Sequence, residues 1–183
     1  MTIYLIRHGK TQANLQHLYC GSADLPLSDQ GREELKQLHY AIQGAKFITS
    51  GMLRTEQTLE ILFGSVPHTQ EPGFREVDFG VFEMKSYEML KDDPAYQAWL
   101  TGDNEANVPP QGESGVQMRQ RVLEAFSRVK EDTVIIAHGG VIAAIMEHLF
   151  PEEGKNRYQW QPKPGHGYAV TQGRYWPIPE LGK

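Results

Sequence analysis

Two arginines and two histidines stand at or near the ends of apolar runs in this sequence, and their side chains could act together on a phosphate. Arg7 and His8 directly follow the run at residues 3–6, His138 directly follows TVIIA, and Arg54 comes shortly after KFITS. A guanidinium can hold two phosphate oxygens at once, and a neutral imidazole can attack phosphorus. These residues indicate phosphoryl transfer, with His8 as the candidate nucleophile and the arginines stabilising charge on the phosphoryl oxygens.

Other kinds of phosphate chemistry can be tested against the same sequence. A P-loop of the GxxxxGK[ST] kind would need a glycine five positions before Gly9, and that residue is Tyr4. A Cys-x5-Arg loop starting at Cys20 would need an arginine where Pro26 stands. The chain contains no DxD pair, no HExxH motif and no comparable metal cluster. We therefore expect neither a bound metal nor a cofactor.

The apolar pattern predicts the strands and helices that would hold these side chains. Strands are expected at residues 3–6, 46–50, 133–137 and 167–170, the last followed by a turn near Gln172 and Gly173 before RYWPI. Ser28 or Asp29 is expected to cap the first long helix. Helices are expected at residues 32–42, 52–63, 87–100 and 141–150, and Leu35, Leu38 and Ile42 would lie on one face of the first. A further helix, capped by Ser114, would carry Val122, Phe126 and Val129 on one face.

Strands that alternate with helices form βαβ units, in which parallel strands are covered by helices on both faces. The unbroken apolar run TVIIA is typical of a strand buried on both faces of such a sheet. The predicted fold is therefore α/β, a three-layer α/β/α sandwich with a mainly parallel central sheet. Ligands of these folds bind outside the carboxyl ends of the strands. Arg7, His8, Arg54 and His138 are thus expected at one rim of the sheet.

The composition predicts a single domain over residues 1–183, with 39% hydrophobic and 22% charged residues. The one cysteine, Cys20, excludes an intramolecular disulfide and fits a reducing cytoplasm. No apolar run approaches a membrane span, and the N-terminal run is too short for a secretory signal. With a net charge of −5 and no basic run, nucleic acid is not an expected partner. The expected partner is a small phosphorylated metabolite. The oligomeric state is unknown.

The order of several short motifs resembles the histidine phosphatase superfamily, also called the phosphoglycerate mutase-like family. The motifs are RHGKTQAN with the spacing RHGxTxxN, DLPLSDQG, SGMLRTEQT, FREVDFGVFE, GES at residues 112–114, and IAHGG. They extend over nearly the whole chain. Each motif alone is modest, but their number and order make the resemblance specific.

The resemblance implies roles for individual residues. His8 would be transiently phosphorylated, and Glu76 would be the general acid, since a carboxyl close to apolar groups can keep a proton to donate. Arg7, Arg54 and His138 would complete the catalytic set around the phosphate. The phosphate would also be bound by Asn14 and by the backbone of Gly139.

Some positions depart from the family pattern or have no assigned chemistry. Lys10 stands where the family usually carries an acidic residue, so no role of that acidic side chain can be transferred. For Glu113 and Ser114 we favour capping or loop anchoring over chemistry. Thr11 would either donate a hydroxyl hydrogen bond to the phosphate loop or merely hold the turn.

Within the family, the short chain favours the compact phosphatase branch, and the segments YCGSADLPLS and FREVDFGVFEM are most similar to α-ribazole-5′-phosphate phosphatases of cobalamin synthesis. A segment at about residues 82–111 would form a cap in which Tyr87, Tyr96 or Trp99 could stack on an aromatic base. The alternatives are a phosphoglycerate mutase-type phosphotransferase, a broad-specificity sugar or metabolite phosphatase, and a catalytically silent phosphate-binding module.

Overall fold

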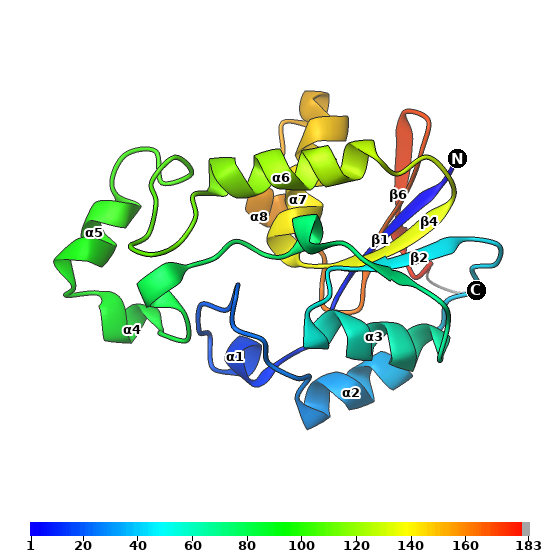
Figure 1. Ribbon diagram of the computed structural model, residues 1–183, viewed down its shortest axis with the longest axis horizontal. Helices are drawn as coiled ribbons and strands as arrows, with labels where there is room; N and C mark the ends of the chain where they lie inside the picture. Colours follow the sequence, from blue (N-terminus) through cyan, green and yellow to red (C-terminus); the bar gives the residue numbers. More distant parts are fainter. Residues whose placement is uncertain (181–183) are drawn as a thin grey trace.

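The computed structural model describes residues 1–180, and a six-stranded sheet forms its centre (Figure 1). The strands are β1 (Ile3–Arg7), β2 (Lys46–Thr49), β3 (Thr69–Gln70), β4 (Thr133–Ala137), β5 (Gly167–Thr171) and β6 (Arg174–Ile178). Their spatial order is β3-β2-β4-β1-β5-β6. The pairs among β1 to β4 are parallel, whereas β5 runs antiparallel to both β1 and β6. The predicted mainly parallel sheet is confirmed.

Helices lie on both faces of this sheet. Those described are α1 (Gln12–Leu15), α2 (Asp29–Lys36), α3 (Leu53–Phe63), α4 (Tyr87–Leu90), α5 (Pro94–Leu100), α6 (Gly115–Ser127), α7 (Gly139–Leu149) and α8 (Arg157–Trp160), with 3-10 turns η1 (Pro72–Phe74), η2 (Gly80–Phe82) and η3 (Pro151–Glu153). Within residues 1–180, none of them is long and apolar enough to span a bilayer.

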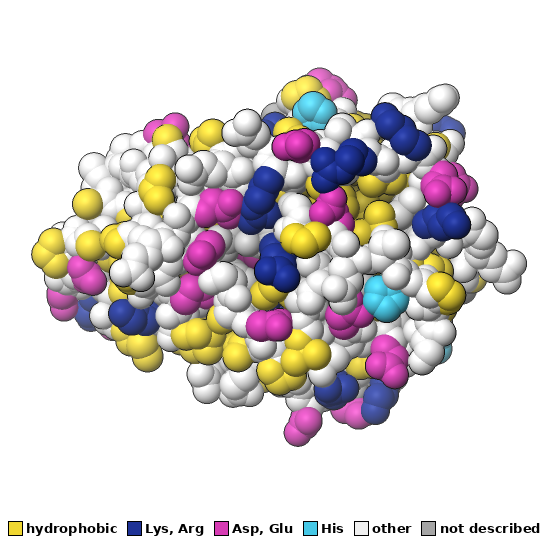
Figure 2. Space-filling model, in the orientation of Figure 1, with side chains coloured by type: hydrophobic (Ala, Val, Ile, Leu, Met, Phe, Trp, Pro, Cys, Tyr) yellow, Lys and Arg dark blue, Asp and Glu magenta, His cyan; other side chains and the backbone are white. Residues whose placement is uncertain are grey.

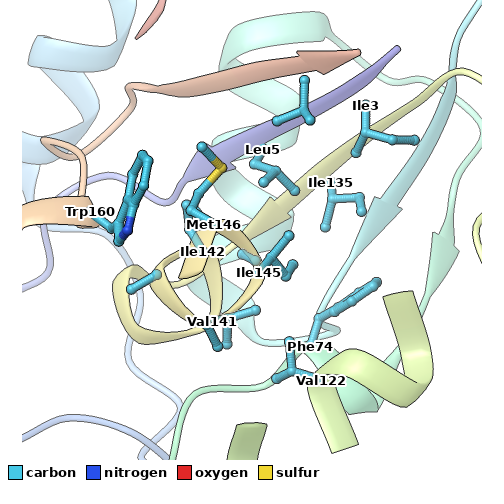
Figure 3. Packing of buried hydrophobic residues seen from close by; sticks show 14 of the residues in the cluster. Ile3, Leu5, Phe74, Val122, Ile135, Val141, Ile142, Ile145, Met146 and Trp160 are labelled. Carbon is cyan, nitrogen blue, oxygen red and sulfur yellow. The ribbon is translucent and has the colours of Figure 1, made fainter. Parts of the chain in front are cut away.

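The two faces have separate apolar cores, which gives the expected three layers. On one face, Ile142 and Ile145 of α7 pack with Leu5 and Ile135 of the sheet, and α6 covers α7 from the side (Figure 3). On the other face, Leu59 of α3 packs with apolar side chains of β1 and β4, and α2 lies beside α3 (Figure 1). All five residues of β4 are buried, as the run TVIIA predicts for a central strand.

The predicted helix at residues 32–42 is wrong in its second half. Ser28 caps α2 through its side chain, and the helix already ends at Lys36. Leu38 and Ile42 lie in the irregular stretch that follows, where Ile42 packs against the apolar core under α3. Contacts with distant segments therefore outweigh the helical spacing of these side chains, and periodicity alone cannot show such contacts.

The predicted helix at residues 87–100 is also wrong, because it is interrupted and forms α4 and α5. Pro94 begins α5, and the Asp93 side chain caps it. Proline has no N–H and clashes with the preceding turn, so one continuous helix cannot pass through this position. The helix capped by Ser114 ends at Ser127, short of Val129.

Helices α4 and α5 lie at one end of the molecule, away from the sheet (Figure 1). This end has an apolar cluster of its own, formed by Phe82, Leu90 and Tyr96 with neighbouring aromatic side chains. Apolar side chains also remain at the surface of this end (Figure 2), and Tyr87 is 58% exposed. Of the aromatic residues expected to stack on a ligand, Tyr96 is therefore core and Tyr87 faces solvent.

Candidate active site

The four side chains named from strand ends lie together at one rim of the sheet. β1 ends at Arg7, which pairs in register with Ala137 at the end of the neighbouring β4. His8 and His138 follow these two strands, and their rings lie 5.1 Å apart between centroids. Arg54 enters from the first turn of α3, next to β2. Parallel pairing of adjacent strands is thus what brings these distant residues together.

His8 is held in one tautomer by its own loop. Its Nδ1 lies 2.6 Å from the carbonyl oxygen of Gly9, which can only accept, so Nδ1 carries the proton and donates. Burial, followed by the positive charges of Arg54 and Arg7, holds the pKa of His8 well below its ordinary value. The ring is therefore neutral at pH 7, and its Nε2 presents a lone pair, as a nucleophile requires.

His138 is fully buried and is oriented by a hydroxyl. Its Nε2 lies 2.8 Å from Ser50 Oγ, and its Nδ1 has no hydrogen-bond partner among the described residues. Burial lowers its pKa well below the ordinary value, and the charges of His8, Arg54, Arg7 and Arg121 add to this effect. Ser50 was not anticipated from the sequence, although it directly follows a strand, the position that singled out the two histidines.

The two arginines are anchored on one side by backbone carbonyls. Arg54 donates to the carbonyl oxygens of Gly21 and Ala23, each at 2.7 Å, and Arg7 donates to that of Pro162 at 2.9 Å. The Nε atoms of both guanidiniums are buried and have no partner within residues 1–180. Buried polar nitrogens are nearly always hydrogen-bonded in folded proteins. The Nε–H groups of Arg7 and Arg54 are therefore available to donate to an anion bound beside His8, and His138 Nδ1 joins them as a donor in the tautomer whose Nε2 accepts from Ser50.

Glu76 reaches the same rim from the loop that follows η1. Its Oε2 accepts the N–H of Gly140 at 2.9 Å, and its Oε1 accepts the N–H of Val77 at 3.0 Å. A Cβ at Gly140 would lie 2.5 Å from Glu76 Oε1 and would displace this carboxyl group. The carboxylate thus sits at the positive N-terminus of α7, beside the place where a phosphate would bind.

Gly139 begins α7, so its backbone N–H is at the helix N-terminus, where anions bind favourably.

The side chain of Asn14 makes hydrogen bonds within its own helix cap. Its Oδ1 accepts the N–H of Thr11 at 2.9 Å and the Thr11 hydroxyl at 3.1 Å, in the capping box of α1. Thr11 therefore holds the turn, and only the Asn14 amide Nδ2 could donate to a phosphate.

Lys10, Ser114 and Glu113 have contacts that fix their side chains. Lys10 forms an ion pair with Glu34 of α2 at 3.0 Å, so its ammonium is directed to that helix. Ser114 caps α6 in a capping box. Glu113 pairs with Arg121 at 2.7 Å and anchors the loop that carries Glu76. Capping and loop anchoring account for the contacts of Ser114 and Glu113.

A cavity of about 670 Å³ opens from Glu76 and Gly140 toward the α5 end of the molecule. The aromatic side chains of Tyr19, Phe79, Trp99 and Tyr158 line it. Trp99 is thus the one member of the expected aromatic trio that reaches this space, whereas Tyr19 and Phe79 were not anticipated. Within residues 1–180, no group of three or more His, Cys, Asp or Glu residues is arranged to hold a metal ion.

Comparison with known proteins gives the class of this arrangement. The model of the histidine phosphatase superfamily (branch 1) matches residues 3–173. The chain belongs to this superfamily, as its motifs predict, and it is a phosphatase with a phosphoglycerate mutase-like fold.

Individual relatives agree with this assignment. The chain is 31% identical over 161 residues to an adenosylcobalamin/alpha-ribazole phosphatase of Escherichia coli strain K12, covering 81% of this chain and 79% of that one. A putative alpha-ribazole-5′-P phosphatase structure from Escherichia coli superimposes with a TM-score of 0.83 at 27% identity, over 97% and 94% of the two chains. A phosphoglycerate mutase structure from Thermus thermophilus gives a TM-score of 0.77 at 30% identity, over 95% of each.

The anion-binding role of the arginines predicts a measurable loss. Arg7→Ala and Arg54→Ala should each weaken inhibition by inorganic phosphate and lower kcat/KM, because each removes charge-assisted hydrogen bonds worth roughly 1.5–3 kcal/mol, about 10- to 150-fold. Arg128→Ala, at the distant C-terminal end of α6, serves as a control. An unchanged kcat/KM in a folded variant would remove that arginine from the site.

Proposed function

We propose that the chain is a metal-independent phosphomonoesterase that works through a phosphohistidine at His8, and that its substrate is α-ribazole 5′-phosphate. The observation that carries the chemistry is the set of buried, unpartnered nitrogens around His8, contributed among the described residues by Arg7, Arg54 and His138. These groups suit a phosphoryl group that is attacked by the lone pair of His8 Nε2.

In the first step, Nε2 of His8 forms a bond to phosphorus as the ester oxygen leaves with the bonding pair. The guanidiniums of Arg7 and Arg54 and the α7 N-terminus stabilise the charge on the equatorial oxygens. Glu76 gives its proton to the departing oxygen. In the second step, water attacks the phosphohistidine, Glu76 takes up the proton of that water, and His8 is released in its neutral form with inorganic phosphate.

The cavity beside Glu76 supports an aromatic leaving group. Its walls of Tyr19, Phe79 and Trp99 could stack on a base attached to the ribose. The two arginines among its described lining residues are already paired: Arg119 with Glu147 at 2.9 Å, and Arg157 with Glu105.

The pairing of these two arginines helps to separate the phosphatase from the mutase. A mutase must also bind the second charged group of a bisphosphate, which calls for a free cation near the leaving group. Paired arginines and aromatic walls favour an uncharged, flat leaving group instead. The adenosylcobalamin/alpha-ribazole phosphatase and the putative alpha-ribazole-5′-P phosphatase that are similar to this chain support the same choice, whereas the similar phosphoglycerate mutase structure represents the alternative. We accordingly propose a place in cobalamin synthesis.

The remaining assignments are proposals of the same kind. We infer a single domain with residues 82–111 acting as a cap, because Trp99 of this segment lines the cavity next to Glu76. We also infer a cytoplasmic location, which is supported by the single cysteine, Cys20.

The substrate assignment predicts a ranking. In excess EDTA, kcat/KM should be highest for α-ribazole 5′-phosphate, lower for sugar phosphates, and lowest for 3-phosphoglycerate, with phosphate as the released product. Trp99→Ala should lower kcat/KM for the aromatic substrate about 2- to 10-fold more than for glycerol phosphate, since aromatic pairs contribute roughly 0.5–1.5 kcal/mol.

Each alternative has its own outcome in this experiment. Formation of 2-phosphoglycerate from 3-phosphoglycerate with a bisphosphate primer would favour the mutase. Equal kcat/KM values across the panel would favour a broad-specificity phosphatase. Absence of phosphate release from every ester would indicate a silent module, and loss of activity in EDTA that metal restores would contradict the mechanism.

A further inference from the structure

Arg121, which no motif of the sequence singles out, uses its whole guanidinium on the segment that carries Glu76. Its NH1 donates to the carbonyl oxygens of Gly73 at 2.9 Å and Arg75 at 2.6 Å, and its NH2 donates to that of Glu76 at 3.0 Å. Its Nε and NH2 also bind both oxygens of Glu113, at 2.8 and 2.7 Å. Three carbonyls of one loop thus converge on a single side chain of α6.

Glu113 extends this clamp to the other side of Glu76. Its backbone N–H donates to the carbonyl oxygen of Asp78 at 2.9 Å, and its Oε1 lies 3.4 Å from the Asp78 N–H. The loop lies outside the sheet, so its carbonyls need partners of this kind. The Glu76 backbone is therefore held by Arg121 on α6, while its carboxylate is held by the N–H of Gly140 on α7.

We propose that Arg121 is a positioning residue for Glu76, which it holds at the distance and angle needed to protonate the leaving group. This inference rests on the proposed role of Glu76 as the general acid. Proton transfer needs the two heavy atoms within about 2.6–3.2 Å, and a displacement of about 1 Å can cost roughly 100-fold in rate. Loss of the clamp should therefore weaken general acid catalysis without removing the acid.

A merely structural role predicts a different result. An anchor that only stabilises the fold would change the melting temperature and affect all substrates alike. A positioning residue for the acid should affect esters of basic alcohols far more than p-nitrophenyl phosphate, because nitrophenolate leaves without a proton. The charge of Arg121 also acts on the nearby His138, so charge and geometry must be separated.

Arg121→Lys and Arg121→Met provide this separation. Lysine keeps the positive charge but cannot reproduce the planar, five-donor geometry. We expect both variants to lose about 10- to 100-fold in kcat/KM on glycerol phosphate and less than about 3-fold on p-nitrophenyl phosphate. Arg174→Met, which removes an exposed arginine at the start of β6, should leave the ratio of the two activities unchanged.

A double variant makes the test specific. Arg121→Lys should cause no further loss on glycerol phosphate when Glu76→Gln has already removed the acid, since the clamp would have nothing left to position. Additive losses, equal losses on both esters, or an unchanged ratio in the single variants would each overturn the proposal. If Arg121→Met does not fold, Glu113→Gln, which weakens the same clamp, gives the same comparison.

The role of Glu76 as the general acid and the role of Arg121 as its positioning residue can each be contradicted separately. If Glu76→Gln alone shows no dependence on the leaving group, Glu76 is not the acid, and the positioning role falls with it. If Glu76→Gln shows the dependence but the Arg121 variants do not, the general acid stands and only the inference about Arg121 is wrong.

Discussion

His8→Ala is expected to abolish turnover on every phosphate ester, by at least about 10⁴-fold in kcat, while the fold persists. The variant removes the imidazole whose Nδ1–H is bound to Gly9 and whose Nε2 therefore carries the lone pair, whereas Nε2 of His138 is already bound to Ser50 Oγ. Phosphate release from p-nitrophenyl and glycerol phosphate measures the loss. His39→Ala, at an exposed position, is the control.

The same variant should also stop labelling of the enzyme by ³²P-phosphate esters, because the phosphohistidine cannot form. Near-normal activity, or labelling that survives the substitution, would show that another residue is the nucleophile. Wild-type labelling should be stable in alkali and lost in acid, as expected for a phosphoramidate bond. Circular dichroism would establish that loss of activity does not result from unfolding.

The dependence of folding stability on pH provides an independent test that His8 is neutral in the folded protein. Because its pKa is depressed in the folded protein, the unfolded chain binds a proton that the folded chain does not, once the pH falls below the ordinary histidine value of about 6.5. Wild-type stability should therefore decrease as the pH falls below that value. His8→Ala should reduce the slope of melting temperature against pH in this range.

The site residues could be predicted from the sequence where a local pattern combines with a general rule of topology. Apolar runs marked the strands before His8 and His138, and the rule that ligands bind at the carboxyl ends of parallel strands placed both histidines at one rim. Arg54 followed from the same reasoning, because α3 begins at the end of the neighbouring strand. These are features that span only a few residues of chain.

The sequence was insufficient where a contact joins distant segments. The hydroxyl of Ser50 meets His138, and the guanidinium of Arg121 meets the Glu76 loop, through packing of elements that no spacing reveals. The end of α2 differs from the prediction for the same reason, since Ile42 packs against the apolar core under α3. The break at Pro94 is different, because the rule against proline within a helix is available from the sequence alone.

Glu76→Gln is expected to slow release of an alkyl leaving group by about 10²–10⁴-fold, the usual scale of general acid catalysis. An alkoxide is strongly basic and must receive a proton as His8 attacks, and the amide of glutamine cannot supply one. Nitrophenolate is a weak base and leaves without this help. The variant should therefore keep much more of its activity on p-nitrophenyl phosphate than on glycerol phosphate.

The substitution is close to isosteric, which makes the comparison clean. The glutamine oxygen can still accept one of the two N–H groups, that of Gly140 or of Val77, but its NH₂ then faces the other donor, so the activity on p-nitrophenyl phosphate also serves as the control for a displaced side chain. Pre-steady-state bursts must show that phosphorylation of His8 limits the rate on both esters. If it does, and the losses on the two esters are nevertheless equal, Glu76 orients the substrate or shapes the local field, and the proton comes from another source.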